Sequence, residues 1–405
     1  MIEEKADIIS PESDQIVDWE NPPTLEDLKQ DLTEATSSHS AHEVEVDTWL
    51  NALNGNQVIK AKKGRSKIVP KLIRKQAEWR YSSLSDPFLN TDELFNTYPR
   101  TFEDKANASQ NGQVLNYQFS SKLNKTKFID EYVRTGVDEG TVVIKLGWEY
   151  ADETIEVPVP DFEFQQTPDA GQIHQQLHGM MQQSPEQFQT EVPPEMQQAH
   201  QMTMQGGVPV VPVQVGSHME EQTKIVRNQP TIDVCDYRNV VIDPTCKGDL
   251  DRAEFIIYSF DTSMSELEKD GRYINLDHVN LESGSALAQE DHSIEDDSNF
   301  TFKDKPRKKI VAYEYWGYWD INDTGVVEPI VATWIGDTLI RMEENPFPDK
   351  KLPFVLVQYL PKRNSVYGEP DGVLIEDNQK IVGAVTRGMI DIIGRSANGQ
   401  VGSRK

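Results

Sequence analysis

The sequence predicts an α+β protein, and three observations support that class. Apolar residues recur at helical spacing between residues 66 and 138, alternate with polar residues between 140 and 360, and return to helical spacing from Val373 to Ile393. At 405 residues the chain is too long for one ordinary core, so we expect two or three packed units.

The N-terminal region, residues 1–63, is expected to be an acidic arm with a basic end. Residues 1–45 are rich in Asp, Glu, Ser and Thr and poor in large apolar side chains. Such a composition buries too little apolar surface to offset the entropy lost on ordering, so it predicts an extended or partly disordered arm. We expect ordered structure to begin near Trp49.

Residues 64–150 are predicted to form helices followed by a first strand. The first helix should run from about Pro70 to Tyr81, because its apolar residues share one face beside a basic face and Pro70 suits a first turn. Those residues are Val69, Ile73, Ala77 and Tyr81. Pro87 disfavours helical dihedrals in the residue before it, so the helix should stop at the segment SLSDP. Two more helices are expected, roughly at Thr101–Ser120 and Lys125–Val137, before the alternating strand VVIKLGWEY.

Residues 151–230 are interpreted as an insertion between strands. Their central part is rich in Gln and Met, and prolines at 185, 193 and 194 should divide it into short helices. What this insertion contacts stays open.

Residues 231–365 are predicted to be rich in β-structure. The segments TIDVCDYRNVVIDPTC and AEFIIYSFDTS are typical of strands, and Ser263 is placed to cap a short helix after the second of them. Alternating apolar residues on both sides of Asp323-Thr324-Gly325 indicate an antiparallel hairpin or meander. The acidic, polar stretch Glu282–Ser298 is expected to be a mobile loop.

Residues 366–405 contain the last predicted helix. Five apolar residues form one stripe along it, while charged residues occupy the remaining surface. The stripe consists of Leu374, Ile381, Val385, Met389 and Ile392. A helix divided in this way needs an apolar neighbour.

Charge and cysteine content exclude several classes of protein. Asp and Glu outnumber Lys and Arg by 67 to 40, a formal charge of −27, so the average surface should repel nucleic acid and anionic lipid. Two cysteines are too few and too isolated for a disulfide framework or a four-ligand zinc site, which indicates a reducing cytoplasm as the place of synthesis. No apolar run is long enough to span a bilayer, and we see no export signal.

The sequence offers no catalytic, cofactor or metal site that we would assign. His174 and His178 have metal-ligand spacing, but Gln follows the first His where a zinc peptidase needs Glu, so we favour polar residues of a Gln-rich helix. No phosphate-binding glycine loop or GxSxG motif occurs. Cys235 and Cys246 are expected to be small buried apolar residues. We therefore predict no enzyme activity and no cofactor.

An ordered series of short motifs resembles the portal proteins of bacteriophages, especially those of short-tailed phages. Near the start, the series comprises Gly64-Arg65-Ser66, the basic helix, Trp79-Arg80-Tyr81, Ser85-Asp86-Pro87-Phe88, Asp104 with Ala106 and Ala108, and Leu115-Asn116-Tyr117. It continues with Asp138-Glu139-Gly140 through Lys145 to Trp148, Asn239-Val240-Val241-Ile242-Asp243-Pro244, and Tyr367-Gly368-Glu369-Pro370 before the last helix. Each motif is short, and the specificity lies in their order.

The resemblance implies a portal fold, in which a helical and β-rich wing leads into a stem helix. It further implies a dodecameric ring at the capsid vertex of the virion, through which double-stranded DNA passes during packaging and ejection. The implied partners are the terminase large subunit, the major capsid or scaffolding protein and a tail adaptor protein, with no membrane. Candidate interface residues are Lys71, Arg74, Lys75 and Arg80, and the apolar stripe would pack in the stem. Portal proteins continue after the stem helix into a clip, a second stem helix and a crown, so we expect further residues beyond Lys405.

Two questions stay open at this point. The basic segment Lys60–Lys75 can face acidic surface on a neighbouring subunit or the capsid shell, or it can be a solvated helix face, and direct DNA contact is the least favoured choice. The rival function is a nucleic-acid-binding module, or another virion structural or adaptor protein without a DNA channel. A nucleic-acid-binding groove would combine the basic patch Lys60–Lys75 with the aromatic residues of YEYWGYWD, but Tyr313, Tyr315 and Trp319 alternate as on one buried strand face.

Overall fold

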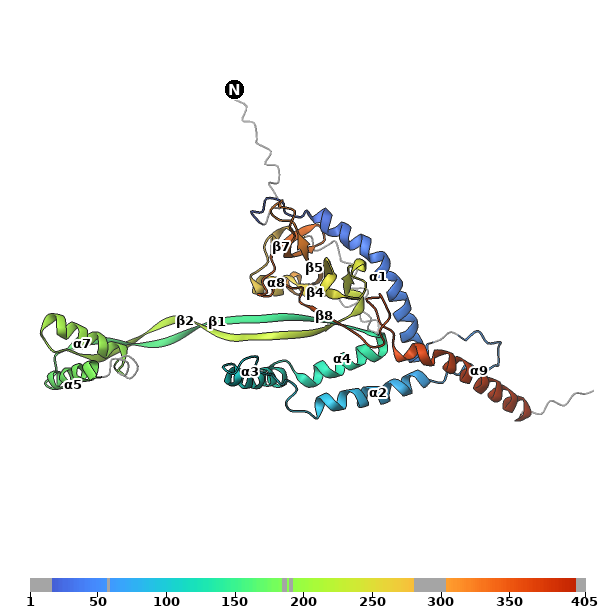
Figure 1. Ribbon diagram of the computed structural model, residues 1–405, viewed down its shortest axis with the longest axis horizontal. Helices are drawn as coiled ribbons and strands as arrows, with labels where there is room; N and C mark the ends of the chain where they lie inside the picture. Colours follow the sequence, from blue (N-terminus) through green and yellow to red (C-terminus); the bar gives the residue numbers. More distant parts are fainter. Residues whose placement is uncertain (1–16, 57–58, 184–187, 189–191, 280–303, 398–405) are drawn as a thin grey trace, which may run out of the picture. The chain divides into compact units, whose positions relative to one another are not determined.

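A computed structural model describes residues 17–56, 59–183, 188, 192–279 and 304–397. These residues combine helices with two sheets, which confirms the α+β class (Figure 1). The chain divides into two compact units, the first made of Met1–Gly147 with Pro230–Lys405 and the second of Trp148–Gln229. The predicted mobile loop, Glu282–Ser298, lies outside the described residues.

A five-stranded antiparallel sheet forms the centre of the first unit, with the strand order β3-β4-β5-β6-β7. The strands are β3 (Val240–Ile242), β4 (Phe255–Ser263), β5 (Lys309–Trp319), β6 (Glu328–Ile335) and β7 (Thr338–Glu344). The register pairs Ile257 with Tyr315 and Ile256 with Trp316. Because successive side chains point to opposite faces, these two pairs enter two different cores, and both faces of the sheet are buried. The predicted hairpin is confirmed as β5 and β6.

Helix α1 (Leu25–Asn54) covers one face of this sheet, so the prediction of an extended arm up to residue 45 was wrong. Thr24 and Asp27 form a reciprocal capping box, and Gly55 ends the helix in a left-handed conformation. Leu28 and Ala35 are buried in the core shared with Trp334. The composition is polar, but apolar and histidine side chains recur every three or four residues on one face, and this periodicity decides the structure. That face contains Leu28, Leu32, Ala35, His39, His42, Val46 and Leu53.

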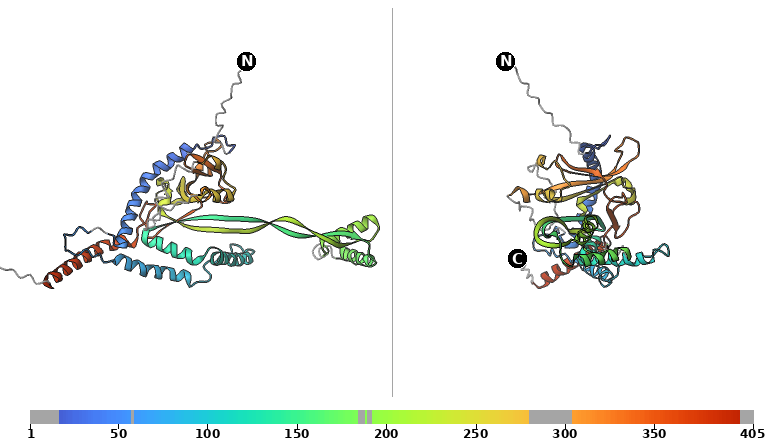
Figure 2. Two further views of the ribbon diagram at one scale, coloured as in Figure 1. Left: turned by 180° about the vertical axis from the view of Figure 1, so that it is seen from behind. Right: turned by 90° about the vertical axis from the view of Figure 1, so that its left-hand side faces the viewer.

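A separate helical layer is formed by α2 (Leu72–Leu89), α3 (Lys105–Tyr117), a π-helical turn (Gln118–Lys122) and α4 (Lys125–Glu139) (Figure 2). The expected stop at SLSDP was wrong, because α2 continues through Pro87. Proline removes one backbone donor, but this turn is exposed, and the backbone N–H of Asn90 still donates to the Asp86 carbonyl at 3.1 Å. The predicted helices at 101–120 and 125–137 are confirmed with small changes of bounds.

A second sheet has the strand order β2-β1-β8. Its strands are β1 (Thr141–Gln165), β2 (Val211–Cys235) and β8 (Phe354–Gln358), and β8 pairs only with the first five residues of β1. The chain then enters α9 (Asp371–Ala397), which confirms the predicted last helix. Helix α8 (Met264–Asp270) is capped by Ser263 as predicted, and Cys235 and Cys246 are both buried and free, also as predicted.

The described residues of the second unit include the distal parts of β1 and β2 and the helices α5 (Ala170–Gln183) and α7 (Pro194–Gly206). Pro194 occupies the first turn of α7, where a missing N–H costs little. His174 of α5 and His200 of α7 are buried, and their Nδ1 atoms lie 3.1 Å apart. Because His174 also contacts the Val210 carbonyl, it joins the two helices to the start of β2.

Candidate assembly surface

Helix α9 starts where two glycines allow close backbone contact. Gly140, between α4 and β1, has a φ of +82°, and a Cβ added to it would lie 2.5 Å from the Glu369 carbonyl carbon. A Cβ on Gly368 would lie 2.5 Å from the Gly140 carbonyl oxygen. The backbone N–H of Gly368 donates to Thr141 Oγ1 at 2.9 Å. Two motifs that are far apart in the sequence therefore meet in space and fix the origin of α9.

One face of α9 is fastened to the first unit by polar contacts. The centre of this face is Gln379, whose residue surface is only 1% exposed. Its Oε1 accepts from the Ile73 backbone N–H at 3.0 Å, and its Nε2 donates to the Ala52 carbonyl at 2.8 Å. This one amide ties α9 to the ends of α1 and α2.

The basic segment runs beside the same helix. The Asp391 carboxylate accepts from the Ser66 backbone N–H at 2.9 Å and from Arg65 Nη1 at 3.2 Å. The Ser66 hydrogen bond, followed by Arg65, lowers the pKa of Asp391 below its usual value. Arg387 donates to the Ile68 carbonyl at 3.0 Å. Part of the positive charge at residues 60–75 is thus used inside the subunit.

The first residue of α9 is held by an ion pair. Arg80 Nε donates to Asp371 Oδ2 at 2.8 Å, and this hydrogen bond raises the pKa of Arg80. On the inner side of α2, Tyr81 donates to Asp138, and the Arg134 guanidinium lies 4.6 Å from the Tyr81 ring centroid. Burial raises the pKa of Tyr81, so its hydroxyl stays protonated.

The opposite side of α9 carries the predicted apolar stripe, and nothing in the described part of the first unit buries it. Its five residues are 52–65% exposed: Leu374, Ile381, Val385, Met389 and Ile392. Ile393 is 65% exposed beside them. An exposed apolar surface of this size on an ordered helix indicates a protein partner.

The four predicted basic interface residues divide into two groups. Arg80 pairs with Asp371, and Arg74 pairs with Glu78 of its own helix at 2.8 Å. Lys71 and Lys75 are exposed, with Lys71 at the N-terminus of α2, where its stem lies against Gly55. The two arginines thus have partners within the subunit, although their side chains are 37–38% exposed, and the two lysines are exposed.

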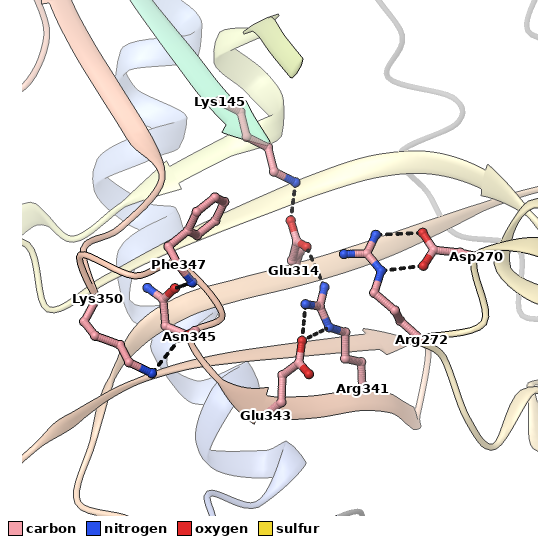
Figure 3. A network of polar contacts seen from close by, with 9 residues as sticks. All are labelled: Lys145, Asp270, Arg272, Glu314, Arg341, Glu343, Asn345, Phe347 and Lys350. Carbon is pink, nitrogen blue, oxygen red and sulfur yellow. Dashed lines mark hydrogen bonds and ion pairs between the residues drawn. The ribbon is translucent and has the colours of Figure 1, made fainter. Parts of the chain in front are cut away.

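A buried ionic network stabilises the sheet to which these elements attach (Figure 3). Glu314 of β5 binds Lys145 of β1 and lies 3.5 Å from Arg341 Nη1 of β7, while Arg341 also binds Glu343. Burial opposes ionisation of Glu314, but Lys145 outweighs it, so the pKa of Glu314 is lowered. Figure 3 also shows Arg272 paired with Asp270 next to this network. The network joins the start of β1 to the five-stranded sheet, and its residue spacing in the sequence gives no sign of it.

The aromatic residues that the rival function would use are core residues. Tyr315 is buried against α1 and donates to Asp31 at 3.0 Å, while Tyr313 and Trp319 pack partly buried on the same core. These three aromatic side chains cannot stack on nucleic-acid bases unless the core of the first unit opens. Within the described residues, no cluster of His, Cys, Asp and Glu has the geometry of a metal site.

Comparison with known protein families gives a match along nearly the entire chain. A family model described as phage SU10 portal protein matches residues 24–405, which includes α1 and the whole second unit. The chain belongs to the phage SU10 portal protein family. This confirms the resemblance to portal proteins of short-tailed phages, so the chain is a portal protein, a head-to-tail connector of the virion.

Membership places the described surfaces in context. Portal proteins are structural rather than enzymatic, and they form an oligomer at a capsid vertex that interacts with packaging and tail components. None of the helices in the described ranges combines the length and apolar character needed to cross a membrane. The exposed stripe of α9 is therefore a candidate contact between subunits of this portal protein.

Proposed function

We propose that this portal protein forms a closed ring, of twelve copies as in the resembling family, through which double-stranded DNA enters and leaves the capsid. The observation that carries the proposal is the two-sided character of α9. Polar contacts fasten one side of the helix to its own subunit, while the apolar side stays exposed. Contacts between unlike faces close into a ring when the rotation between neighbours permits.

The charge of the chain suits a channel. Each phosphate that Lys or Arg neutralises adds salt-dependent affinity, which would hold DNA that has to slide. A subunit with a formal charge of −27 supplies repulsion instead. Passage of DNA without hydrolysis by the ring itself is the mechanical role that follows.

We assign the regions of the chain accordingly. The helical layer and the sheets of residues 64–365 form the wing, and residues 366–405 begin the stem. The assembly forms in the host cytoplasm, docks the terminase large subunit and later a tail adaptor protein, and is incorporated next to the major capsid or scaffolding protein. Lys71 and Lys75 are the proposed contact to a neighbouring subunit or to the shell.

Electron microscopy of the purified protein tests the proposal. Class averages should show closed rings with a central opening and a single dominant stoichiometry. A protein that stays monomeric over a wide range of concentration and salt would refute the ring, and retained DNA binding at moderate salt would favour a nucleic-acid-binding module.

A further inference from the structure

Helix α3 and the π-helical turn after it contain the longest run without charge in the first unit. None of the residues 106–121 is Asp, Glu, Lys or Arg, in a chain with 26% charged residues. Depletion of charge characterises the centre of protein interfaces, whereas free helix surfaces are usually charged.

Within its own subunit, α3 buries very little. Only Ala108 and Gly112 of its 13 residues are buried, and Val114, Leu115 and Tyr117 are exposed. An isolated helix of this length is marginal in water, because helices owe most of their stability to tertiary packing. Its own subunit therefore supplies little of the packing that stabilises a helix of this length.

The loop before α3 is held in one conformation by hydrogen bonds to the helix. Asn116 accepts from the Phe95 backbone N–H at 2.9 Å and donates back to the Phe95 carbonyl at 3.0 Å. Thr97 donates to the Ala108 carbonyl, and Thr101 donates to Asp104 at 2.7 Å. These hydrogen bonds hold the backbone of the loop in place, so its exposed side chains keep a fixed position on the surface.

The side chains that it presents are aromatic. Tyr98 is 84% exposed and Phe102 is 91% exposed, with exposed Arg100 between them. Aromatic residues and arginine dominate the binding energy of protein interfaces, and a rigid loop presents them with little loss of entropy on binding. We call Tyr98, Phe102 and the uncharged surface of α3 the aromatic wing surface.

We propose that the aromatic wing surface docks against a neighbouring copy of this chain. Two copies that each carry a charge of −27 repel each other, so contacts between copies are favoured where acidic groups are few; Glu103 and Asp104 are exposed next to Phe102, but residues 106–121 contain no acid. Figures 1 and 2 show α3 and α9 at opposite ends of the pair formed by α2 and α4. A heterologous ring contact needs two unlike patches that are well separated on the subunit. The aromatic wing surface and the stripe of α9 meet this requirement.

The test compares ring formation of the full chain with that of Tyr98→Ser combined with Phe102→Ser. Both side chains are solvent-exposed in the subunit, so the circular dichroism spectrum and the unfolding midpoint should not change. We expect the fraction of protein in rings, measured by mass photometry, to fall at least about tenfold at equal concentration. Amide exchange in α3 should also be fast in the monomer and slow in the ring.

Two control variants separate the possible causes. Tyr98→Phe with Phe102→Tyr keeps the aromatic rings and should assemble like the parent. Val326→Ser with Val327→Ser removes exposed apolar surface from the β5–β6 turn and should also assemble normally.

The inference rests on the proposed ring, and the outcomes distinguish the two. A parent that forms rings together with a Ser variant that forms them equally well overturns the inference alone, and the same holds if only incorporation into capsids is lost. A parent that never forms rings overturns both.

Discussion

Replacement of Gln379 tests how α9 is held in the subunit. Gln379→Met keeps the length of the side chain but removes both hydrogen bonds, which leaves the buried Ile73 N–H without a partner, whereas the Ala52 carbonyl still accepts from the Gly55 N–H at 3.3 Å. An unsatisfied buried backbone group costs roughly 1–3 kcal/mol. Gln379→Met should therefore lower the free energy of unfolding by about 1–3 kcal/mol.

Urea unfolding at a fixed protein concentration measures this loss, since self-association makes the midpoint depend on concentration. Asn378→Met is the matched control, because Asn378 is the exposed neighbour on the same helix and its replacement should change stability by less than about 0.5 kcal/mol. Hydrogen exchange gives a local reading, because the amide of Ile73 should exchange faster in the Gln379 variant. Equal stabilities of the two variants would refute the role that we give to this amide.

Three further predictions concern charge. Burial, followed by the charges of His39 and Lys362, lowers the pKa of His42 from 6.5 to about 4. Between these two pH values the unfolded chain binds more protons than the folded chain, so acidification from pH 7 to pH 4 should lower the free energy of unfolding by about 3 kcal/mol. His42→Phe, which keeps the stack on Tyr367, should show less of this pH dependence in urea titrations at pH 7 and pH 4, and identical losses would contradict the assignment. Glu314→Gln leaves Arg341 buried beside a neutral amide and should lower the free energy of unfolding, measured by urea titration, by about 3–5 kcal/mol, whereas Glu343→Gln at the exposed partner should lower it by under about 1 kcal/mol. Lys71→Glu with Lys75→Glu should leave folding unchanged but reduce incorporation into procapsids, and unchanged incorporation would indicate a solvated helix face.

The sequence predicts those elements whose hydrophobic period is undisturbed. The stripe of α9 and the alternation on both sides of Asp323-Thr324-Gly325 were sufficient to predict helix α9 and the β5–β6 hairpin, because each pattern has one dominant period over a long segment. Helix α1 has an equally regular period, but two of its buried positions are His39 and His42. Composition alone does not reveal the buried face of α1. The regular spacing of its apolar and histidine residues was the signal that could have revealed it.

The candidate surface was predictable only on its apolar side. Nothing local marks Gln379 as buried, because its partners are backbone groups 306 and 327 residues away. The ion pair of Arg80 with Asp371 likewise depends on the crossing of Gly140 and Gly368, which tertiary contact alone creates. The sequence therefore does not show which basic residues form ion pairs within the subunit, such as Arg80, and which are exposed, such as Lys71 and Lys75.

The mass distribution of the assembled protein, compared between the parent and Val385→Asp, tests the central claim most directly. Val385 is 52% exposed in the subunit, so an aspartate there should leave the monomer folded. In a ring that buries the α9 stripe, the same carboxylate loses its hydration without a partner, at a cost of several kcal/mol per subunit. We predict closed rings for the parent and only monomers or small oligomers for the variant, whereas rings of equal mass and yield for both would contradict an interface at α9.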